Sequence, residues 1–241
     1  MNAGNKGPRL GRDSFLGKRI VVFTAHPDDE QLAAGTMYKN HQMGGETFLI
    51  CATSGEKGKS HLKRHVGDVA LARIRRNELL KAAKVLKIDK VIFLGFPDAG
   101  VRENKRALYE KSLAIIMKIK PEHMLSFGPD GVSGHWDHII VGKIAMRIAK
   151  KLKIPLAAFT LSSESRDIRM KLILGRRKFG SYAGIPKHRE SDITIKIDAA
   201  VKRRAMRYHV SQFGGAAPYA DLPKQIRDKI FGYEHFVREK I

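Results

Sequence analysis

The stretch VVFTAHPDDEQLAAG, residues 21–35, runs from apolar β-forming residues straight into four ionisable side chains within five positions. A continuous apolar run before such a change is typical of a strand buried on both faces of a parallel sheet. In open α/β sheets, functional groups gather in the crevice beyond the carboxyl ends of the strands. We therefore interpret HPDDE, residues 26–30, as part of a functional site, with a charged first helical turn as the alternative.

Apolar runs and amphipathic stretches alternate along the rest of the chain. The expected strands lie at 19–25, 46–53, 90–96, within 122–131, at 154–161 and at 191–197. The expected helices lie at 29–44, 69–88, 107–120, 138–152 and 198–213. This alternation predicts an α/β, Rossmann-like three-layer fold: a mostly parallel sheet flanked by helices, with the active site at the carboxyl ends of the strands. We expect residues 1–17 to form a flexible leader and residues 18–241 to form a single domain.

The chain carries 46 Lys and Arg against 24 Asp and Glu, a formal net charge of +22. Such a balance favours contact with anions such as nucleic acid, acidic lipid or phosphorylated ligands. The basic residues are spread along the chain, so a solvated basic surface is our first interpretation. The helix that carries Lys202, Arg203, Arg204 and Arg207 lacks the aromatic interleaving typical of single-strand binding, and we expect no specific nucleic-acid partner. A protein that binds nucleic acid or an anionic surface, with a structural metal, is the alternative.

Three further features bear on location. Cys51 is the only cysteine, so the chain forms no intramolecular disulfide and needs no oxidising compartment. The N-terminal residues lack the apolar core of a signal peptide, and no apolar run approaches the ~20 residues that span a bilayer. We therefore expect a cytoplasmic protein without a transmembrane segment.

Two donors in the HPDDE run have a spacing that suits a metal ion. His26 and Asp29 are three residues apart in a tight turn and can converge on one ion. Catalytic zinc takes three protein ligands from His, Asp or Glu and keeps a position for water. Asp28 would then lie beside that water, where a carboxylate can act as general base.

A third donor is expected from SFGPDGVSGHWDHIIVG, residues 126–142, which follows the fourth expected strand and should open onto the same crevice. This segment contains His135 and His138, three residues apart at the start of a helix. Such a pair is weak evidence alone. It gains weight because it follows a strand of the same sheet as HPDDE.

AHPDDE at 25–30 together with GHWDH at 134–138 resembles the PIG-L/LmbE family of zinc-dependent de-N-acetylases, whose pattern is (P/A)HPDDE followed by HPDH or HxDH. The likeness extends to RIRRNELLKAAKVLKIDKVIFLGFPDAG at 73–100 and to FGYEHF at 231–236. It covers residues 19–142 well and the rest weakly. The resemblance implies an enzyme, a zinc-dependent carbohydrate de-N-acetylase that removes an acetyl group from an N-acetylglucosamine-type substrate.

The resemblance also implies roles for the residues of the two motifs. It implies three zinc ligands: His26, Asp29 and His138. Asp28 would be the general base, and protonated His135 would stabilise the oxyanion or protonate the leaving amine. Asp137 would hydrogen-bond a histidine of its own motif. Another divalent metal, such as Fe²⁺, would suit the same donors.

Outside these motifs, Arg75 matches the family's substrate-contacting arginine and Asp98 its sugar-contacting aspartate. His209 lies in HVSQ, which is similar to the family's HxSQ, and either reaches the rim of the site or packs on its helix. The chain departs from the family at Ser133, where some members carry a tyrosine that assists the oxyanion. Two residues are candidates to replace it: Tyr182 and Tyr219.

The identity of the substrate stays open. We expect a small molecule or glycoside, and the basic composition favours an acidic one. Hydrolysis of a different acyl or ester bond at the same metal is the alternative reaction, and homo-oligomerisation is left open by the sequence.

Overall fold

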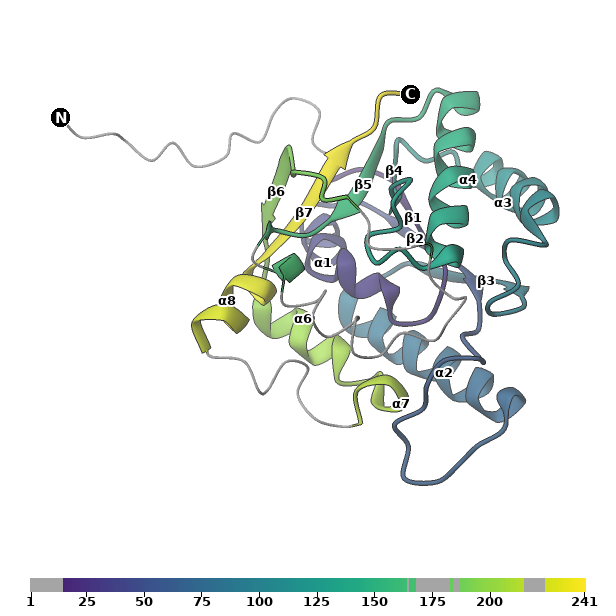
Figure 1. Ribbon diagram of the computed structural model, residues 1–241. Helices are drawn as coiled ribbons and strands as arrows, with labels where there is room; N and C mark the ends of the chain where they lie inside the picture. Colours follow the sequence, from purple (N-terminus) through teal and green to yellow (C-terminus); the bar gives the residue numbers. More distant parts are fainter. Residues whose placement is uncertain (1–14, 164, 168–182, 184–186, 215–223) are drawn as a thin grey trace.

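The computed structural model describes residues 15–163, 165–167, 183, 187–214 and 224–241. Its centre is a seven-stranded sheet in the order β3-β2-β1-β4-β5-β7-β6 (Figure 1). The strands are β1 (Ile20–Thr24), β2 (Thr47–Thr53), β3 (Lys90–Phe96), β4 (His123–Phe127), β5 (Leu156–Thr160), β6 (Ile193–Lys196) and β7 (Tyr233–Arg238). Strands β1 to β5 are parallel, and β7 runs antiparallel between β5 and β6. The prediction of an α/β fold with a mostly parallel sheet is confirmed.

Helices cover both faces of this sheet. They are α1 (Ala34–Gln42), α2 (Asp68–Leu86), α3 (Lys105–Ile119), α4 (Trp136–Leu152), α6 (Ala199–Met206) and α8 (Lys224–Gly232), with short turns η1 (Asp29–Leu32) and α7 (Val210–Phe213). Helices α1, α2 and α6 contact one another on one side of the sheet, and α3 and α4 contact each other on the opposite side (Figure 1).

The strand order reverses between β1 and β4. Strand β1 is buried along its whole length and pairs with both neighbours, so that Val22 lies between Leu49 of β2 and Leu125 of β4. From β1 the chain builds outward through β2 and β3, and it then returns to place β4 beside β1. Such a reversal opens a crevice at the carboxyl ends of the two strands. The HPDDE residues follow β1 and the segment leading to His135 follows β4, so both segments reach this crevice.

Two expected helices are divided in the structure. The stretch 29–44 forms the 3₁₀ helix η1 and then α1, and the stretch 198–213 forms α6 and α7. Asp198 caps α6, because its side chain accepts hydrogen bonds from two N–H groups of the first turn. Helix α4 begins at Trp136, two residues earlier than expected, because His135 is its N-cap and accepts a backbone N–H.

Strand β7 and helix α8 are not predicted from the sequence. Strand β7 reads YEHFVR, and its buried positions are Glu234 and Phe236. A glutamate on the buried face hides the apolar alternation by which a strand is recognised. Glu234 is accommodated because it pairs with Lys202 Nζ at 2.9 Å and accepts the N–H groups of Gly35 and Thr36 at the start of α1.

The expected leader falls largely outside the described residues, which begin at Phe15. Phe15 and Leu16 are buried and pack against the hydrophobic core. These two residues therefore belong to the folded unit, although the expected boundary lay after residue 17.

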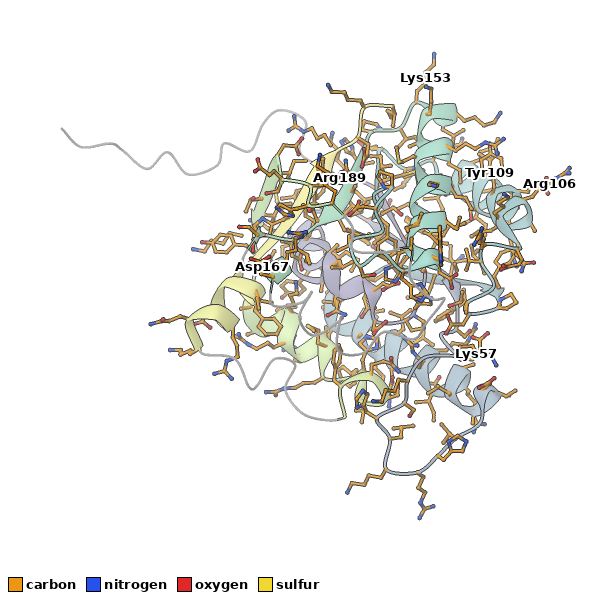
Figure 2. All side chains as sticks on the ribbon, in the orientation of Figure 1. Lys57, Arg106, Tyr109, Lys153, Asp167 and Arg189 are labelled. Carbon is orange, nitrogen blue, oxygen red and sulfur yellow. The ribbon has the colours of Figure 1, made fainter. Side chains whose placement is uncertain are left out.

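Basic side chains extend from well-separated parts of the surface. Arg106 of α3 and Lys153, which follows α4, both point away from the ribbon (Figure 2). This spread is in line with a dispersed basic surface. Among the described residues, we find no helix with the length and apolar character needed to cross a membrane.

Candidate active site

The carboxylates of the loop after β1 accept hydrogen bonds from the backbone of the same loop. Asp29 Oδ2 accepts hydrogen bonds from two backbone N–H groups at the end of β1 (3.1 and 2.7 Å), and Glu30 Oε2 accepts the N–H of Asp28 (2.9 Å). Asp28 has a φ of 107°, a region that residues other than glycine rarely adopt. This arrangement sends the two aspartates to different partners, Asp29 to His138 and Asp28 to Arg75.

Three donor side chains converge in the crevice. His26 Nδ1 lies 3.2 Å from His138 Nε2 and 3.5 Å from Asp29 Oδ2, and Asp29 Oδ1 lies 3.2 Å from His138 Nε2. One possible ligand atom from each residue lies within 4.8 Å of the other two. Two imidazole nitrogens and one carboxylate oxygen form a donor set that suits a catalytic divalent metal such as zinc.

Each histidine of this group is held by its second ring nitrogen. His26 Nε2 lies 3.0 Å from Asp98 Oδ1 and 3.2 Å from Asp137 Oδ2. His138 Nδ1 lies 3.2 Å from the carbonyl oxygen of Gly131. Oxygen acceptors at these positions keep the ring protons there and leave His26 Nδ1 and His138 Nε2 available to a metal.

A second group of possible donors shares His26. The ligand atoms of His26, His135 and Asp137 also lie within 4.8 Å of one another. This group suits a metal less well, because Asp137 faces the nitrogen of His26 that Asp98 also holds, and because His135 Nδ1 accepts the N–H of Asp137 at 3.1 Å. The group of His26, Asp29 and His138 is therefore the better candidate metal centre.

Carboxylates dominate the electrostatics of the crevice. Burial by itself would lower the pKa of His26, but Asp98, Asp137 and Asp29 raise that pKa well above its ordinary value. Burial opposes ionisation of Asp29, yet His138 and His26 hold the pKa of Asp29 well below its usual range. The centre thus favours positive charge, which a divalent cation supplies.

Asp28 differs from Asp29 in its surroundings. Its Oδ1 pairs with Arg75 Nη2 at 3.0 Å, and its side chain remains partly exposed. Removal from water raises the pKa of Asp28 to about 6, with Arg75 opposing this change and Asp29 and Glu30 adding to it. A carboxyl group that titrates near neutral pH can both take up and release a proton.

His135 lies against both histidines of the candidate metal centre. Its ring centroid is 5.0 Å from that of His26 and 5.1 Å from that of His138. Burial, with charge on His26 and His138, lowers the pKa of His135 to about 3. Because Nδ1 accepts a backbone N–H, the neutral ring carries its proton on Nε2. This differs from the protonated His135 that the resemblance implies.

Asp137 and Asp98 lie behind His26. Asp137 is 1% exposed; its carboxylate bonds His26 and accepts the N–H of Ala99 at 2.9 Å, and its backbone N–H donates to His135 of its own motif at 3.1 Å. Asp98, expected to contact a sugar, is largely buried and accepts the N–H of Lys57 at 2.8 Å in addition to contacting His26. In this structure both carboxylates orient the imidazole of His26.

Arg75 reaches the loop from α2 and is 3% exposed. Its guanidinium donates to the carbonyl oxygens of Gly55 (2.7 Å) and Pro27 and pairs with Asp28. Gly55 has a φ of 70°, and a Cβ at this position would lie 2.3 Å from the guanidinium, so the approach requires glycine. Arg75 thus holds the loop, and its expected contact with substrate stays a prediction.

His209 is 0% exposed, and its Nε2 lies 2.5 Å from Glu30 Oε1. Its burial does not fit the rim of the site, and its partner Glu30 lies in η1 and not on the helix of His209, so neither interpretation gave this contact. Two residues later, Ser211 donates from its N–H and its hydroxyl to Glu78 of α2, at 2.8 and 2.6 Å. The sequence does not predict these partners, and the only local signal is that Arg75 and Glu78 are three residues apart within RIRRNELL, residues 73–80.

Ser133 stands where some members of the family carry a tyrosine. Its Oγ lies 3.1 Å from His138 Nδ1, so it helps to hold that ring. The two candidate replacements, Tyr182 and Tyr219, lie outside the described residues.

Comparison with known proteins places these motifs in a family. The model of PIG-L, described as GlcNAc-PI de-N-acetylase, matches residues 21–149. Among curated proteins, the 1D-myo-inositol 2-acetamido-2-deoxy-alpha-D-glucopyranoside deacetylase of Streptomyces avermitilis is 29% identical, and the match covers 91% of this chain and 91% of that protein.

Solved structures share the fold at lower identity. The N,N'-diacetylchitobiose deacetylase of Pyrococcus horikoshii is 20% identical with a TM-score of 0.63, over 92% of this chain and 84% of that one. The 4-carboxy-2-hydroxymuconate hydratase GalB of Pseudomonas putida is 18% identical with a TM-score of 0.66, over 92% and 97%. The fold therefore accommodates more than one reaction. The matched segment 21–149 is more than half of the 241 residues and holds both motifs, and the chain belongs to the PIG-L family.

Proposed function

We propose that the protein removes the acetyl group from an N-acetylglucosaminyl substrate by metal-dependent hydrolysis, with zinc as the metal. The observation that carries this proposal is the convergence of His26, Asp29 and His138, with the partly exposed Asp28 adjoining Asp29 in the chain. The relative from Streptomyces avermitilis is named for a substrate in which an acetamido-sugar is joined to inositol, and this supports a small glycoside as the substrate.

Three atoms would hold the zinc: His26 Nδ1, Asp29 Oδ1 and His138 Nε2. Zinc, when bound, acidifies a water molecule and polarises the carbonyl oxygen of the acetamide. Fe²⁺ would suit the same donors. The carboxylates that raise the pKa of His26 support a cation at this point.

Asp28 would act as general base and take a proton from the attacking water. It would then pass a proton to the nitrogen of the acetamide as the C–N bond breaks, giving acetate and a free amine. A pKa of about 6 supports both steps. Neutral His135 would donate its Nε2–H to the acetamide oxygen as negative charge develops there. This division of roles gives the leaving-group proton to Asp28.

We also propose that the substrate carries an acidic substituent. The segment between β2 and α2, residues 54–67, carries four Lys or Arg and two His against one Glu. It lines a cleft of about 470 Å³ with Lys57, Arg64 and His65, and the cleft also contains Glu56 and, from α2, Asp68, which pairs with Lys57 Nζ. The backbone N–H of Lys57 donates to Asp98. Figure 2 marks Lys57 beside α2. Such cations would suit a carboxylate or a phosphate. A cytoplasmic location is a prediction from the sequence alone, and the sequence leaves the oligomeric state open.

Two other functions use the same observations. Hydrolysis of another acyl or ester bond would employ the same centre with a different substrate. A nucleic-acid binding protein with a structural metal has less support, because structural zinc normally has four ligands in a closed site, whereas this centre offers three beside a partly exposed carboxyl group.

The test is the release of amine from N-acetylglucosaminyl inositol, diacetylchitobiose and an anionic N-acetylglucosaminyl glycoside by zinc-loaded protein. Asp28→Asn is the matched variant, because asparagine tolerates a positive φ. We expect turnover to fall by roughly 10²–10⁴-fold while the zinc content is unchanged. An active Asp28→Asn variant would refute the role of Asp28. Wild-type protein that cleaves acyl esters and no acetamide would favour the alternative hydrolase.

A further inference from the structure

We propose that Glu30 and His209 are positioning residues that hold the backbone of Asp28 in its active conformation. This inference rests on the proposed function, in which Asp28 is the general base. Glu30 bridges the two partners: its Oε1 lies 2.5 Å from His209 Nε2, and its Oε2 accepts the backbone N–H of Asp28 at 2.9 Å. Glu30 and His209 are 1% and 0% exposed, so water does not compete for either contact.

Asp28 needs such support because of its backbone. Its φ of 107° lies in the region that only glycine adopts freely. A residue held there relaxes to a negative φ unless its surroundings hold it in place, and relaxation would turn the carboxyl group away from the metal centre. The contact from Glu30 fixes the N–H group at the bond about which φ is measured, and it therefore acts directly on this angle.

His209 is itself anchored. Its carbonyl oxygen accepts the N–H groups of two residues of α7, both at 3.0 Å, and Ser211 in α7 donates twice to Glu78 of α2. One turn earlier in α2 stands Arg75, whose guanidinium pairs with the side chain of Asp28. The segment 209–213 thus supports Asp28 by two routes, through Glu30 to its backbone and through α2 to its side chain. This segment lies beyond the residues 21–149 that match the family model.

A second buried ion pair in the same region provides a matched control for the contact between His209 and Glu30. Lys202 of α6 pairs with Glu234 of β7 at 2.9 Å, and both side chains are at most 5% exposed. Glu234 accepts the N–H groups of Gly35 and Thr36 at the start of α1. This pair secures the same layer of the fold through Gly35 and Thr36 of α1, which lie after residues 26–30 in the chain.

The experiment compares His209→Ala, His209→Gln and Lys202→Met with the wild type in kcat, KM, zinc content and crystal structure. We expect His209→Ala to lower kcat by about 10–100-fold with zinc content retained and KM within about threefold, as for the loss of a supporting group. His209→Gln should recover most of kcat, because its amide N–H replaces Nε2–H. Lys202→Met should lower the melting temperature and leave kcat within about twofold. Where His209→Ala does not fold, Glu30→Gln takes its place.

The crystal structures separate this inference from the proposed function. In His209→Ala, Asp28 should leave its positive φ, and in Lys202→Met it should keep it. A wild-type protein that releases no amine would overturn the proposed function, and the conformation of Asp28 in the variants would still decide the inference. An unchanged Asp28 in His209→Ala, or an equal loss of kcat in Lys202→Met, would overturn the inference.

Discussion

Replacing Asp137 by asparagine should weaken zinc binding while leaving the fold intact. Asp137 Oδ2 faces His26 Nε2 at 3.2 Å and accepts the N–H of Ala99 at 2.9 Å. Asparagine keeps the shape and an oxygen for both contacts, and it removes the negative charge that makes His26 a better ligand. Loss of such an outer carboxylate typically costs 10–100-fold in metal affinity.

The structure indicates which end of this range applies. His26 has a second carboxylate partner, Asp98, at 3.0 Å, so Asp137→Asn leaves one charge in place. We therefore expect the zinc Kd to rise about tenfold in Asp137→Asn, about 1.4 kcal/mol. The double variant Asp98→Asn/Asp137→Asn should lose about 100-fold, about 2.7 kcal/mol.

The assay is a competition titration of zinc between the protein and a chromophoric chelator. Asp89→Asn is the control, because Asp89 accepts the N–H of Thr47 at the amino end of β2, far along the strand from the crevice. Its zinc Kd should equal that of the wild type. A folded double variant with a wild-type zinc Kd would refute the reasoning.

Three further predictions follow from single contacts. Burial lowers the pKa of His209, but Glu30 raises it overall, so this pair should stabilise the fold fully below about pH 6.5 and lose its contribution as the pH rises through the folded pKa. The free energy of unfolding in urea should therefore vary less with pH for His209→Gln than for the wild type. Parallel pH curves for the two proteins would contradict this. A Cβ in Gly142→Ala would lie 2.5 and 2.7 Å from two carbonyl oxygens at the end of β4, so we expect a loss of about 1–3 kcal/mol in the free energy of unfolding. An unchanged free energy of unfolding would show that α4 can shift freely. Arg75→Lys replaces a guanidinium group that reaches three oxygens by a single ammonium group, so kcat should fall about tenfold or more at unchanged zinc content. A wild-type kcat in this variant would count against the contacts described.

The candidate metal centre was predictable because its signals are local. The apolar run of β1 ends in HPDDE, and parallel strands deliver their carboxyl ends to one edge of the sheet, so the histidines after β4 had to reach the same crevice. Strand β3, Lys90–Phe96, spans the expected residues because its signal is also local: its apolar run is bounded by polar residues.

The supports of that centre were not predictable from local pattern. Glu30 and His209 are 179 residues apart in the sequence. Each is a polar residue that would be expected at an exposed position until its partner is known. The buried Glu234 concealed β7 in the same way, because its counter-charge, Lys202, lies on α6. The protonation of His135 likewise depends on two histidines brought together only by the fold.

The most direct test of the central claim is an anomalous difference map at the zinc absorption edge, from crystals of the zinc-loaded protein. The account predicts one peak about 2.0–2.2 Å from His26 Nδ1, Asp29 Oδ1 and His138 Nε2, with the carboxyl group of Asp28 left uncoordinated. A peak bound instead by His26 Nε2, His135 and Asp137, or no peak in this crevice, would contradict it.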